Sequence, residues 1–305
     1  MSYLTERRYI LSGTPVSGGG GGEDFKKLYG QLKFLDPELW GSYKEFCSEL
    51  VKGYDYFGKP NEYDVKKCRE LMKNYGIVAR LDTCYDMPDS LDIPINVDLP
   101  GSTIPVYRDI LAGRVSDYNI ELKSGGSRYI KLLEVVSGFL NTEEEEPREY
   151  KTEKPEALGN ILDSTDDKVV VFCNFRHSID VCEEVCKKYG KTVVYDGRST
   201  KDTWRDFQFG DAKYLICQYQ SGGVGIDLFV SHTMVFYEPT TSSLLLEQSK
   251  ARIRRKGQTK KCLYYWIATN GTLEKKATDT VRSGVDVTRE MLDEWAKQKE
   301  IADNF

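Results

Sequence analysis

The sequence predicts an α/β fold in which a parallel sheet, with helices on both faces, follows a mostly helical region. The run KVVVFC (168–173) is nearly continuously apolar, as expected of a parallel strand buried on both faces. Downstream of it, short apolar runs alternate with helical segments, which is typical of βαβ units. Upstream of residue 150, apolar residues recur instead at helical spacing. The 305 residues are enough to bury a substantial core.

The helical region is predicted to extend from about Arg8 to Leu140. It opens with a short strand-like run at Tyr9–Leu11, and five consecutive glycines (18–22) follow a Ser-Gly-Thr-Pro sequence. Phe25, Leu28, Leu32 and Leu35 then predict a helix that ends at Asp36-Pro37, because the residue before a proline disfavours the helical conformation. Further helices are predicted at about 42–51, 65–75, 103–112 and 128–139. The acidic stretch 142–147 is a candidate linker.

The α/β region is predicted to alternate regularly between strands and helices. Strands are expected at 168–173, 192–195, 213–217, 233–237 and 262–267. Helices are expected at 178–189, 203–209 and 242–256, and again from 272, with a break near Gly284 and a further helix over 287–302. The order implies right-handed crossovers and a parallel sheet.

Composition excludes several classes of protein. Lys and Arg number 43 against 48 Asp and Glu, so the net charge of −5 argues against a uniformly basic nucleic-acid coat, although not against a local basic groove. No apolar run approaches the roughly 20 residues that span a bilayer, and Met1–Arg8 lacks the apolar core of a secretory signal. Eight cysteines without a CxxC pair and two histidines argue against a metal site and for reduced thiols.

Ligands of open parallel sheets bind beyond the carboxyl ends of the strands, so residues that follow the predicted strands are candidates. Asn174 follows the first strand. After the third strand comes a glycine-rich stretch, Gln218–Asp227. Taken alone, this stretch fits either a loop that contacts phosphate or sugar, or a tight turn from strand to helix.

The most distinctive segment is Gln248–Gln258, QSKARIRRKGQ. Seven basic residues and no acidic ones lie between Gln248 and Lys261. Arg252 and Arg255 are three residues apart and would share one face of the predicted helix. Such a run is commonly just a solvated surface, but guanidinium groups beside a glycine-rich loop suit bidentate phosphate recognition.

Four segments in order carry a resemblance to a known family. SGTP (12–15), FCNF (172–175), SGGVGIDL (221–228) and QSKARIRRKGQ resemble motifs III to VI of superfamily-two helicase-like ATPases. The spacing Q-x-x-x-R-x-x-R-x-G-Q is similar to the sixth motif of Swi/Snf-type (sucrose non-fermenting) double-stranded DNA translocases. The His-Arg-x-Gly-Arg-x-Gly-Arg ending of DEAD-box RNA helicases is absent.

The resemblance implies a motor with two RecA-like lobes that bind ATP between them, and this chain would supply the second, RecA-like lobe. Arg252 and Arg255 would then be arginines that reach the γ-phosphate of ATP, where charge develops during phosphoryl transfer. The family's motifs assign the remaining positions as follows: nucleotide binding to Gly223, Gly225, Asp227 and Gln248; DNA contact to Asn174, Gln220 and Ser221; coupling of hydrolysis to lobe movement to Ser12, Gly13 and Thr14. The implied partners are double-stranded DNA and an amino-terminal lobe, which would hold most of the ATP and Mg²⁺.

The sequence departs from the family pattern at several positions. Asp227 stands where the family usually has Asn, and Tyr237-Glu238-Pro239 replaces the common Trp-Asn-Pro. The five glycines replace a short polar segment. These 305 residues contain neither a GxxxxGK[ST] phosphate loop nor an acidic metal-binding box. We therefore expect the chain to be the carboxyl half of the motor and not to hydrolyse ATP appreciably by itself.

This interpretation predicts four parts: 1–17 as the end of the first lobe, 18–150 as a helical protrusion with a linker, 151–275 as the second lobe, and 276–305 as terminal helices. A cytoplasmic (bacterial or phage) or nuclear location, without a membrane, is expected. Two alternatives remain open. One is a non-catalytic module that keeps the lobe fold and binds nucleic acid or protein. The other is a degenerate P-loop enzyme such as a kinase, which the missing phosphate loop disfavours.

Overall fold

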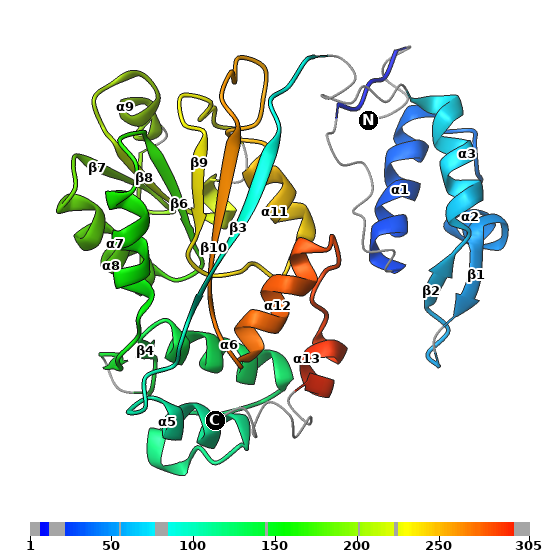
Figure 1. The fold of residues 1–305 in the computed structure, drawn as a ribbon. Helices are drawn as coiled ribbons and strands as arrows, with labels where there is room; N and C mark the ends of the chain where they lie inside the picture. Colours follow the sequence, from blue (N-terminus) through cyan, green and yellow to red (C-terminus); the bar gives the residue numbers. More distant parts are fainter. Residues whose placement is uncertain are drawn as a thin grey trace. The chain divides into compact units, whose positions relative to one another are not determined.

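A computed structural model describes residues 7–11, 22–54, 56–76, 85–143, 146–200, 202–222 and 225–295. The chain forms two compact units, Met1–Cys84 (unit 1) and Tyr85–Phe305 (unit 2). In the ranges given, no helix is both long and apolar enough to cross a membrane. Figure 1 shows the elements of each unit.

The described residues of unit 1 form three helices and a hairpin. Its elements are α1 (Gly22–Leu35), α2 (Tyr43–Leu50), β1 (Val51–Tyr54), β2 (Pro60–Tyr63) and α3 (Val65–Tyr75). The three predicted helices are confirmed, and Ser42 and Asp64 cap α2 and α3 by accepting a bond from the backbone N–H three residues later. The hairpin was not predicted, because its strands are short and polar. The predicted strand at Tyr9–Leu11 is wrong: these residues form no ladder, and Leu11 is 98% exposed.

The core of unit 1 is aromatic. The helices and the hairpin bury Trp40, Phe46 and Tyr63 together with Leu28 and Leu32. The rings of Trp40 and Phe46 meet edge to face with centroids 5.0 Å apart, an arrangement that the ring quadrupoles favour. Unit 1 therefore has a hydrophobic core of its own.

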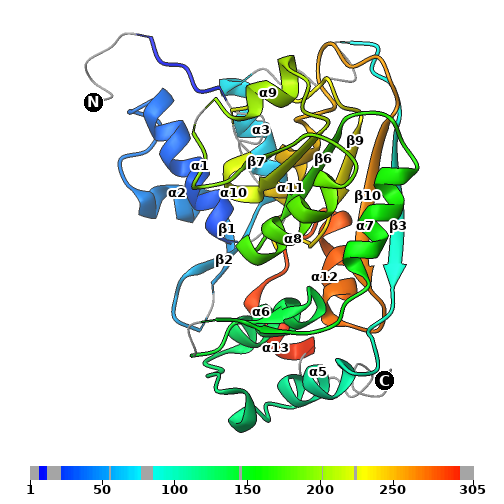
Figure 2. The same ribbon diagram turned by 90° about the vertical axis from the view of Figure 1, so that its left-hand side faces the viewer.

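Unit 2 is built on six parallel strands in the order β3-β10-β9-β6-β8-β7. The strands are β3 (Ser90–Val97), β6 (Val169–Cys173), β7 (Thr192–Tyr195), β8 (Tyr214–Gln218), β9 (Thr233–Phe236) and β10 (Cys262–Thr269). The five strands predicted from apolar runs are all present. Figures 1 and 2 show β3 beside β10, although more than 160 residues separate them in sequence.

Helices cover both faces of the sheet, as predicted. Alternate strand residues face α7 (Lys154–Asp163) and α8 (Arg176–Lys187) on one side (Figure 2). The opposite residues face α9 (Trp204–Phe209), α10 (Tyr219–Gly222), α11 (Ser243–Lys250) and α12 (Leu273–Arg282). Every β6 residue is fully buried, which explains its continuous apolar sequence.

A third core packs helices that follow β3 against helices that follow β10. It is formed by α5 (Ile104–Leu111), α6 (Gly125–Val136), α12 and α13 (Arg289–Trp295). The short elements η2 (Ser116–Tyr118), β4 (Phe139–Leu140) and β5 (Arg148–Glu149) complete this region, and β4 pairs with β5. The sequence predicts that residues 85–150 belong to the protrusion and linker, whereas the structure includes them in unit 2. The helical protrusion remains a proposal for unit 1.

The strand β3 was not predicted because SLDIPINV contains a proline and three polar residues. The carbonyl of Asp89 accepts a bond from Cys262 N of β10 (3.1 Å), and that of Val97 accepts one from Asn270 N, directly after β10 (2.8 Å). By the two-residue repeat of a strand, odd-numbered β3 residues direct their backbone groups to β10, and Pro94 directs its nitrogen to the other edge. Within the described ranges no strand pairs with that edge, so the missing N–H breaks no ladder.

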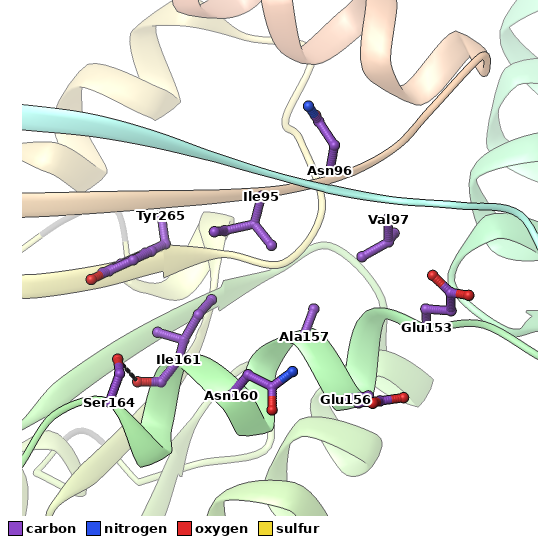
Figure 3. A pocket seen from close by; sticks show the side chains of 10 residues that line it. All are labelled: Ile95, Asn96, Val97, Glu153, Glu156, Ala157, Asn160, Ile161, Ser164 and Tyr265. Carbon is purple, nitrogen blue, oxygen red and sulfur yellow. Dashed lines mark hydrogen bonds between the residues drawn. The ribbon is translucent and has the colours of Figure 1, made fainter.

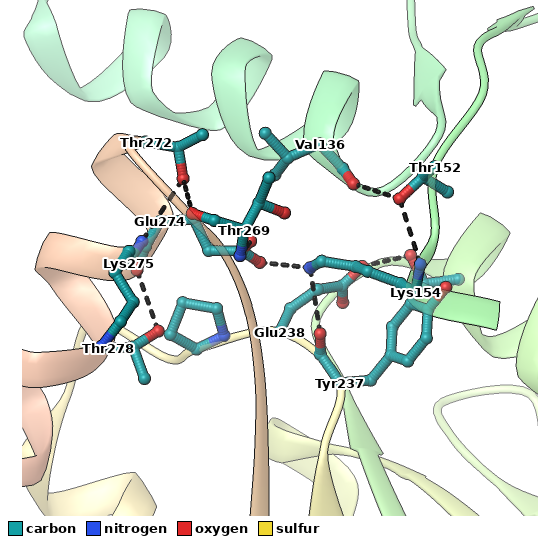
Figure 4. Close-up of polar contacts among 12 residues, drawn as sticks. Val136, Thr152, Lys154, Tyr237, Glu238, Thr269, Thr272, Glu274, Lys275 and Thr278 are labelled. Carbon is teal, nitrogen blue, oxygen red and sulfur yellow. Dashed lines mark hydrogen bonds and ion pairs between the residues drawn. The ribbon is translucent and has the colours of Figure 1, made fainter. Parts of the chain in front are cut away.

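A buried ion pair ties α7 to α12. Lys154 and Glu274 are in contact, with the Lys154 side chain fully buried, and Lys154 Nζ also donates to Tyr237 O at 3.1 Å (Figure 4). Glu274 Oε2 accepts a bond from Thr269 N at 2.9 Å. The lysine thus joins α7 to the end of β9 and to α12.

Candidate functional site

The two candidate arginines lie in a turn and not on a helix. The helix α11 ends at Lys250, and residues 251–257 form turns that end at Gly257, whose φ of +102° suits glycine. The predicted helix over 242–256 is therefore too long, and the shared helical face of Arg252 and Arg255 is wrong. The last helical residue, Lys250, is held by side-chain contacts: its Nζ lies 3.1 Å from Asp92 and 4.5 Å from the centre of the Tyr264 ring.

The turn is joined to the loop that follows α10. Arg252 Nη1 donates to Ile226 O at 3.2 Å, and Leu228 N donates to Arg252 O at 3.1 Å. Burial lowers the pKa of Arg252, and the neighbouring Arg255 lowers it further, whereas Asp227 opposes this shift. The guanidinium keeps its charge, since arginine titrates far above neutral pH.

Arg255 forms an ion pair with Asp227. Both residues were predicted for the nucleotide site, from motifs that are 28 residues apart in sequence. We define Arg252, Arg255 and Asp227 as the arginine cluster. In the loop before Asp227, Gly225 has a φ of +80°, and a Cβ there would meet nothing within 4 Å, so the conformation and not a lack of space favours glycine.

A residue that the sequence analysis did not select holds the turn and the loop together. Gln258 is 8% exposed, and its Nε2 donates to the carbonyls of Phe229 (3.2 Å), Ser231 (2.8 Å) and Ile253 (3.2 Å). Its Oε1 accepts bonds from Thr259 N and Lys260 N, at 3.1 and 3.0 Å. The signal was present, because Gln258 closes the motif that contains both arginines.

The basic run is partly neutralised by carboxylates from elsewhere in the chain. Besides the pairs of Lys250 and Arg255, Lys260 Nζ contacts Asp167 at 2.7 Å. Lys256 Nζ lies 5.3 Å from the centre of the Tyr85 ring. The sequence alone suggested a uniformly exposed basic surface. These contacts show that the segment is not one.

The predicted DNA-contacting residues lie at the carboxyl end of the sheet. Asn174 follows β6, its N–H donates to Glu238 Oε2 (2.8 Å), and its Nδ2 donates to Pro239 O. Glu238 is fully buried, and burial raises its pKa, whereas Lys154 opposes this shift. The side-chain amide of Asn174 thus serves an internal contact in this structure.

Gln220 and Ser221 lie on the single turn α10, directly after β8. Gln220 is exposed and Ser221 is half-buried. The next residue, Gly222, is buried, and a Cβ at this position would lie 2.7 Å from Cys217 Cβ and 3.0 Å from the Phe172 ring. The absence of a side chain at Gly222 lets α10 pack directly on β6 and β8.

The remaining predicted residues belong neither to the arginine cluster nor to the group at the carboxyl end of the sheet. Gln248 is half-buried on α11, four residues before Arg252. Ser12, Gly13, Thr14 and Gly223 lie outside the described residues.

A pocket of about 560 Å³ lies between β3 and α7 (Figure 3). It is lined by residues of both elements and of β10: Ile95, Asn96, Val97, Glu153, Glu156, Ala157, Asn160, Ile161, Ser164 and Tyr265. None of the predicted site residues lines it. No cluster of three or more His, Cys, Asp or Glu that could bind a metal occurs in the described part of the chain.

Comparison with known proteins identifies the lobe. The family model for the helicase conserved C-terminal domain matches residues 153–257. The DNA repair protein rhp54 of Schizosaccharomyces pombe is 26% identical over 89% of this chain, and the DNA repair and recombination protein RAD54-like of Drosophila willistoni is 27% identical over 90%. The chain contains a Swi/Snf-type helicase C-terminal lobe.

The helicase lobe also has a structural relative. The C-terminal part of the Fun30 ATPase domain superposes with a TM-score of 0.55 at 15% identity, covering 72% of this chain and 98% of that one. This likeness shows the fold. The chain spans about two fifths of its curated relatives, namely 37% of rhp54 and 41% of the Drosophila protein.

Proposed function

We propose that this chain is the carboxyl-terminal half of an ATP-dependent double-stranded DNA translocase or helicase-like motor. Its helicase lobe would supply Arg252 and Arg255 to a nucleotide held by an amino-terminal RecA-like lobe. The observation that carries the proposal is the arginine cluster, in which two motifs distant in sequence meet at one turn of the lobe.

The donor chemistry of the arginine cluster fits a triphosphate. The Arg255 side chain is 40% exposed, and Arg252 is half-buried beside it. Guanidinium groups form bidentate, charge-assisted bonds with phosphate oxygens, and their charge would stabilise the phosphoryl group during transfer. Bound ATP would supply the phosphoryl group. Gly223, Gly225 and Gln248 would adjoin the nucleotide, and Mg²⁺ would be held mainly by the other lobe.

DNA is the proposed partner of the carboxyl end of the sheet. Gln220 is exposed there, and the polar side chains of Gln220 and Ser221 suit contacts to backbone phosphates, which do not depend on base sequence. The curated relatives are named as DNA repair proteins, which supports DNA as the partner. For Asn174, a DNA contact would require its side chain to leave Pro239 O.

The Arg255–Asp227 pair gives one reason to retain a second candidate, a non-catalytic module. A guanidinium already occupied by a carboxylate has fewer N–H groups for phosphate. The two candidates differ in whether Arg255 accelerates hydrolysis.

The test is DNA-stimulated ATP hydrolysis by the chain fused behind a P-loop lobe of a Swi/Snf-type ATPase. We expect Arg255→Ala to lower kcat at least about a hundredfold, because arginine fingers contribute roughly 10³–10⁵. Arg254→Ala is the matched control, since it removes the same charge from the same turn, and should leave kcat within about threefold. Equal effects of the two substitutions, or no effect of Arg255→Ala on an active fusion, would support the non-catalytic module.

A further inference from the structure

The Asp227 carboxylate contacts the guanidinium of Arg255. Asp227 lies between Ile226 and Leu228, which are 2% and 0% exposed. These two anchors fix the backbone on both sides of Asp227, while its own side chain is 50% exposed. The carboxylate therefore lies at the surface between two buried residues.

The turn that carries Arg255, the partner of Asp227, is also fixed by hydrogen bonds. Arg255 lies in the turn that Gln258 ties to the carbonyls of Phe229 and Ser231, in the same loop as Asp227. Arg255 O itself accepts a bond from Gln258 N at 3.0 Å. Because loop and turn are bonded to each other, the backbones that carry the two charges are held next to one another.

We infer that Asp227 is an internal competitor of phosphate: its carboxylate occupies the guanidinium of Arg255 until a polyphosphate displaces it. Asp227 contacts Nη1 of Arg255, so a phosphate can bind the Nη1–Nη2 face of the guanidinium in bidentate fashion only after the carboxylate leaves. Asp227 thus acts as a positioning residue for Arg255. The inference rests on the proposed function, in which Arg255 binds nucleotide phosphate.

The exposure of the pair limits the strength of this competition. With side chains 40% and 50% exposed, the ion pair is in contact with water and is weakened by it. Surface ion pairs of this kind shift equilibria by about two- to fivefold, so a polyphosphate with several charges can displace the carboxylate. Removing Asp227 should strengthen phosphate binding by this factor and no more.

The experiment measures the affinity of the full 305-residue chain for inorganic tripolyphosphate by calorimetry at constant ionic strength. We expect Asp227→Asn to bind about two- to fivefold more tightly than the wild type. Arg255→Ala should abolish the gain and weaken binding in both backgrounds. The Arg255 Nε–H signal in an NMR spectrum should move on addition of tripolyphosphate, and at lower concentration in Asp227→Asn than in the wild type.

Asp167→Asn is the matched control, because Asp167 pairs with Lys260 of the same basic run at 2.7 Å with comparable exposure. It removes the same charge but should change the affinity by less than about 1.5-fold. An equal gain from both substitutions would mean a general charge effect and overturn the competition. Unchanged or weaker binding by Asp227→Asn, with Arg255→Ala still harmful, would overturn it and leave the proposed function standing. If Arg255→Ala binds tripolyphosphate like the wild type, both fail.

Discussion

At the scale of single residues, the helicase lobe buries several charges close to its carboxyl edge. Glu238 accepts bonds from Asn174 N and from Ser178 Oγ, and Lys154 contacts Glu274. Figure 4 shows Lys154 and Glu238 near the end of β9. Buried charges are costly unless they are paired and hydrogen-bonded. Lys154 and Glu274 pair with each other, and Glu238 accepts hydrogen bonds. These contacts fix α7, α8 and α12 against the ends of the strands.

Glu238 makes the stability of the fold depend on pH. Burial raises its pKa above the ordinary 4.5, so the folded protein binds this proton more tightly than the unfolded chain does. The resulting stabilisation is complete below about pH 4.5 and is lost as the pH rises through the folded-state pKa. Glutamine does not ionise, and it can still accept from Asn174 N while its amide donates to Ser178 Oγ.

We therefore expect the free energy of unfolding of Glu238→Gln, relative to the wild type, to increase from pH 5 to pH 8. Urea denaturation of both proteins at several pH values measures this difference. Glu156→Gln, a substitution at an exposed residue of α7, controls for a general loss of negative charge and should show no such trend. A constant difference for Glu238→Gln across the range would mean that its pKa is not raised.

At the scale of elements, the candidate site depends on how one turn and one loop are joined. The sequence predicts a long helix over 242–256, but α11 ends at Lys250 and the arginines follow in turns. Arg255 and Asp227, which the motifs assign to one site, are in contact. Their meeting could not be derived from helical periodicity, because it depends on Gln258 and on hydrogen bonds between segments some 25 residues apart.

Replacing Gln258 by methionine should loosen this junction. Methionine fills similar space but leaves the carbonyls of Ser231 and Ile253 without their donor, and a buried polar group left unsatisfied costs about 1–3 kcal/mol. We expect the free energy of unfolding to fall by about 2–3 kcal/mol. Lys261→Met, three residues later and exposed, should change it by no more than about 0.5 kcal/mol. Equal stability of the two variants in chemical denaturation would show that the Gln258 bonds contribute little.

At the scale of the whole molecule, the boundary of the α/β unit is not where composition changes. The acidic stretch near residue 145 suggests a boundary at 150, but β3 and the helices α5 and α6 belong to unit 2. Tyr107 Oη accepts a bond from Leu273 N at 2.8 Å, which links α5 to the start of α12. Removing residues 85–150 would uncover β10 and delete most of the third core.

This arrangement predicts the outcome of truncation. A chain of residues 85–305 should fold cooperatively, because it retains all three cores of unit 2. A chain of residues 151–305 should aggregate or melt without cooperativity, since β10 loses its neighbour and α12 loses α6. Thermal melting followed by circular dichroism, with light scattering, distinguishes the two. Cooperative melting of the shorter chain would restore the boundary at 150.

The sequence by itself determined the class of fold, the five strands with apolar runs, most helices and the family of the lobe. Those features depend on local periodicity and on motifs, which are properties of short segments. Only the tertiary structure decided the place of β3, because a strand with Pro94 is stable at an edge that no local pattern specifies. It also decided that Arg255 meets Asp227 and that Lys154 is buried, since the partner of a charge is chosen by packing between distant segments.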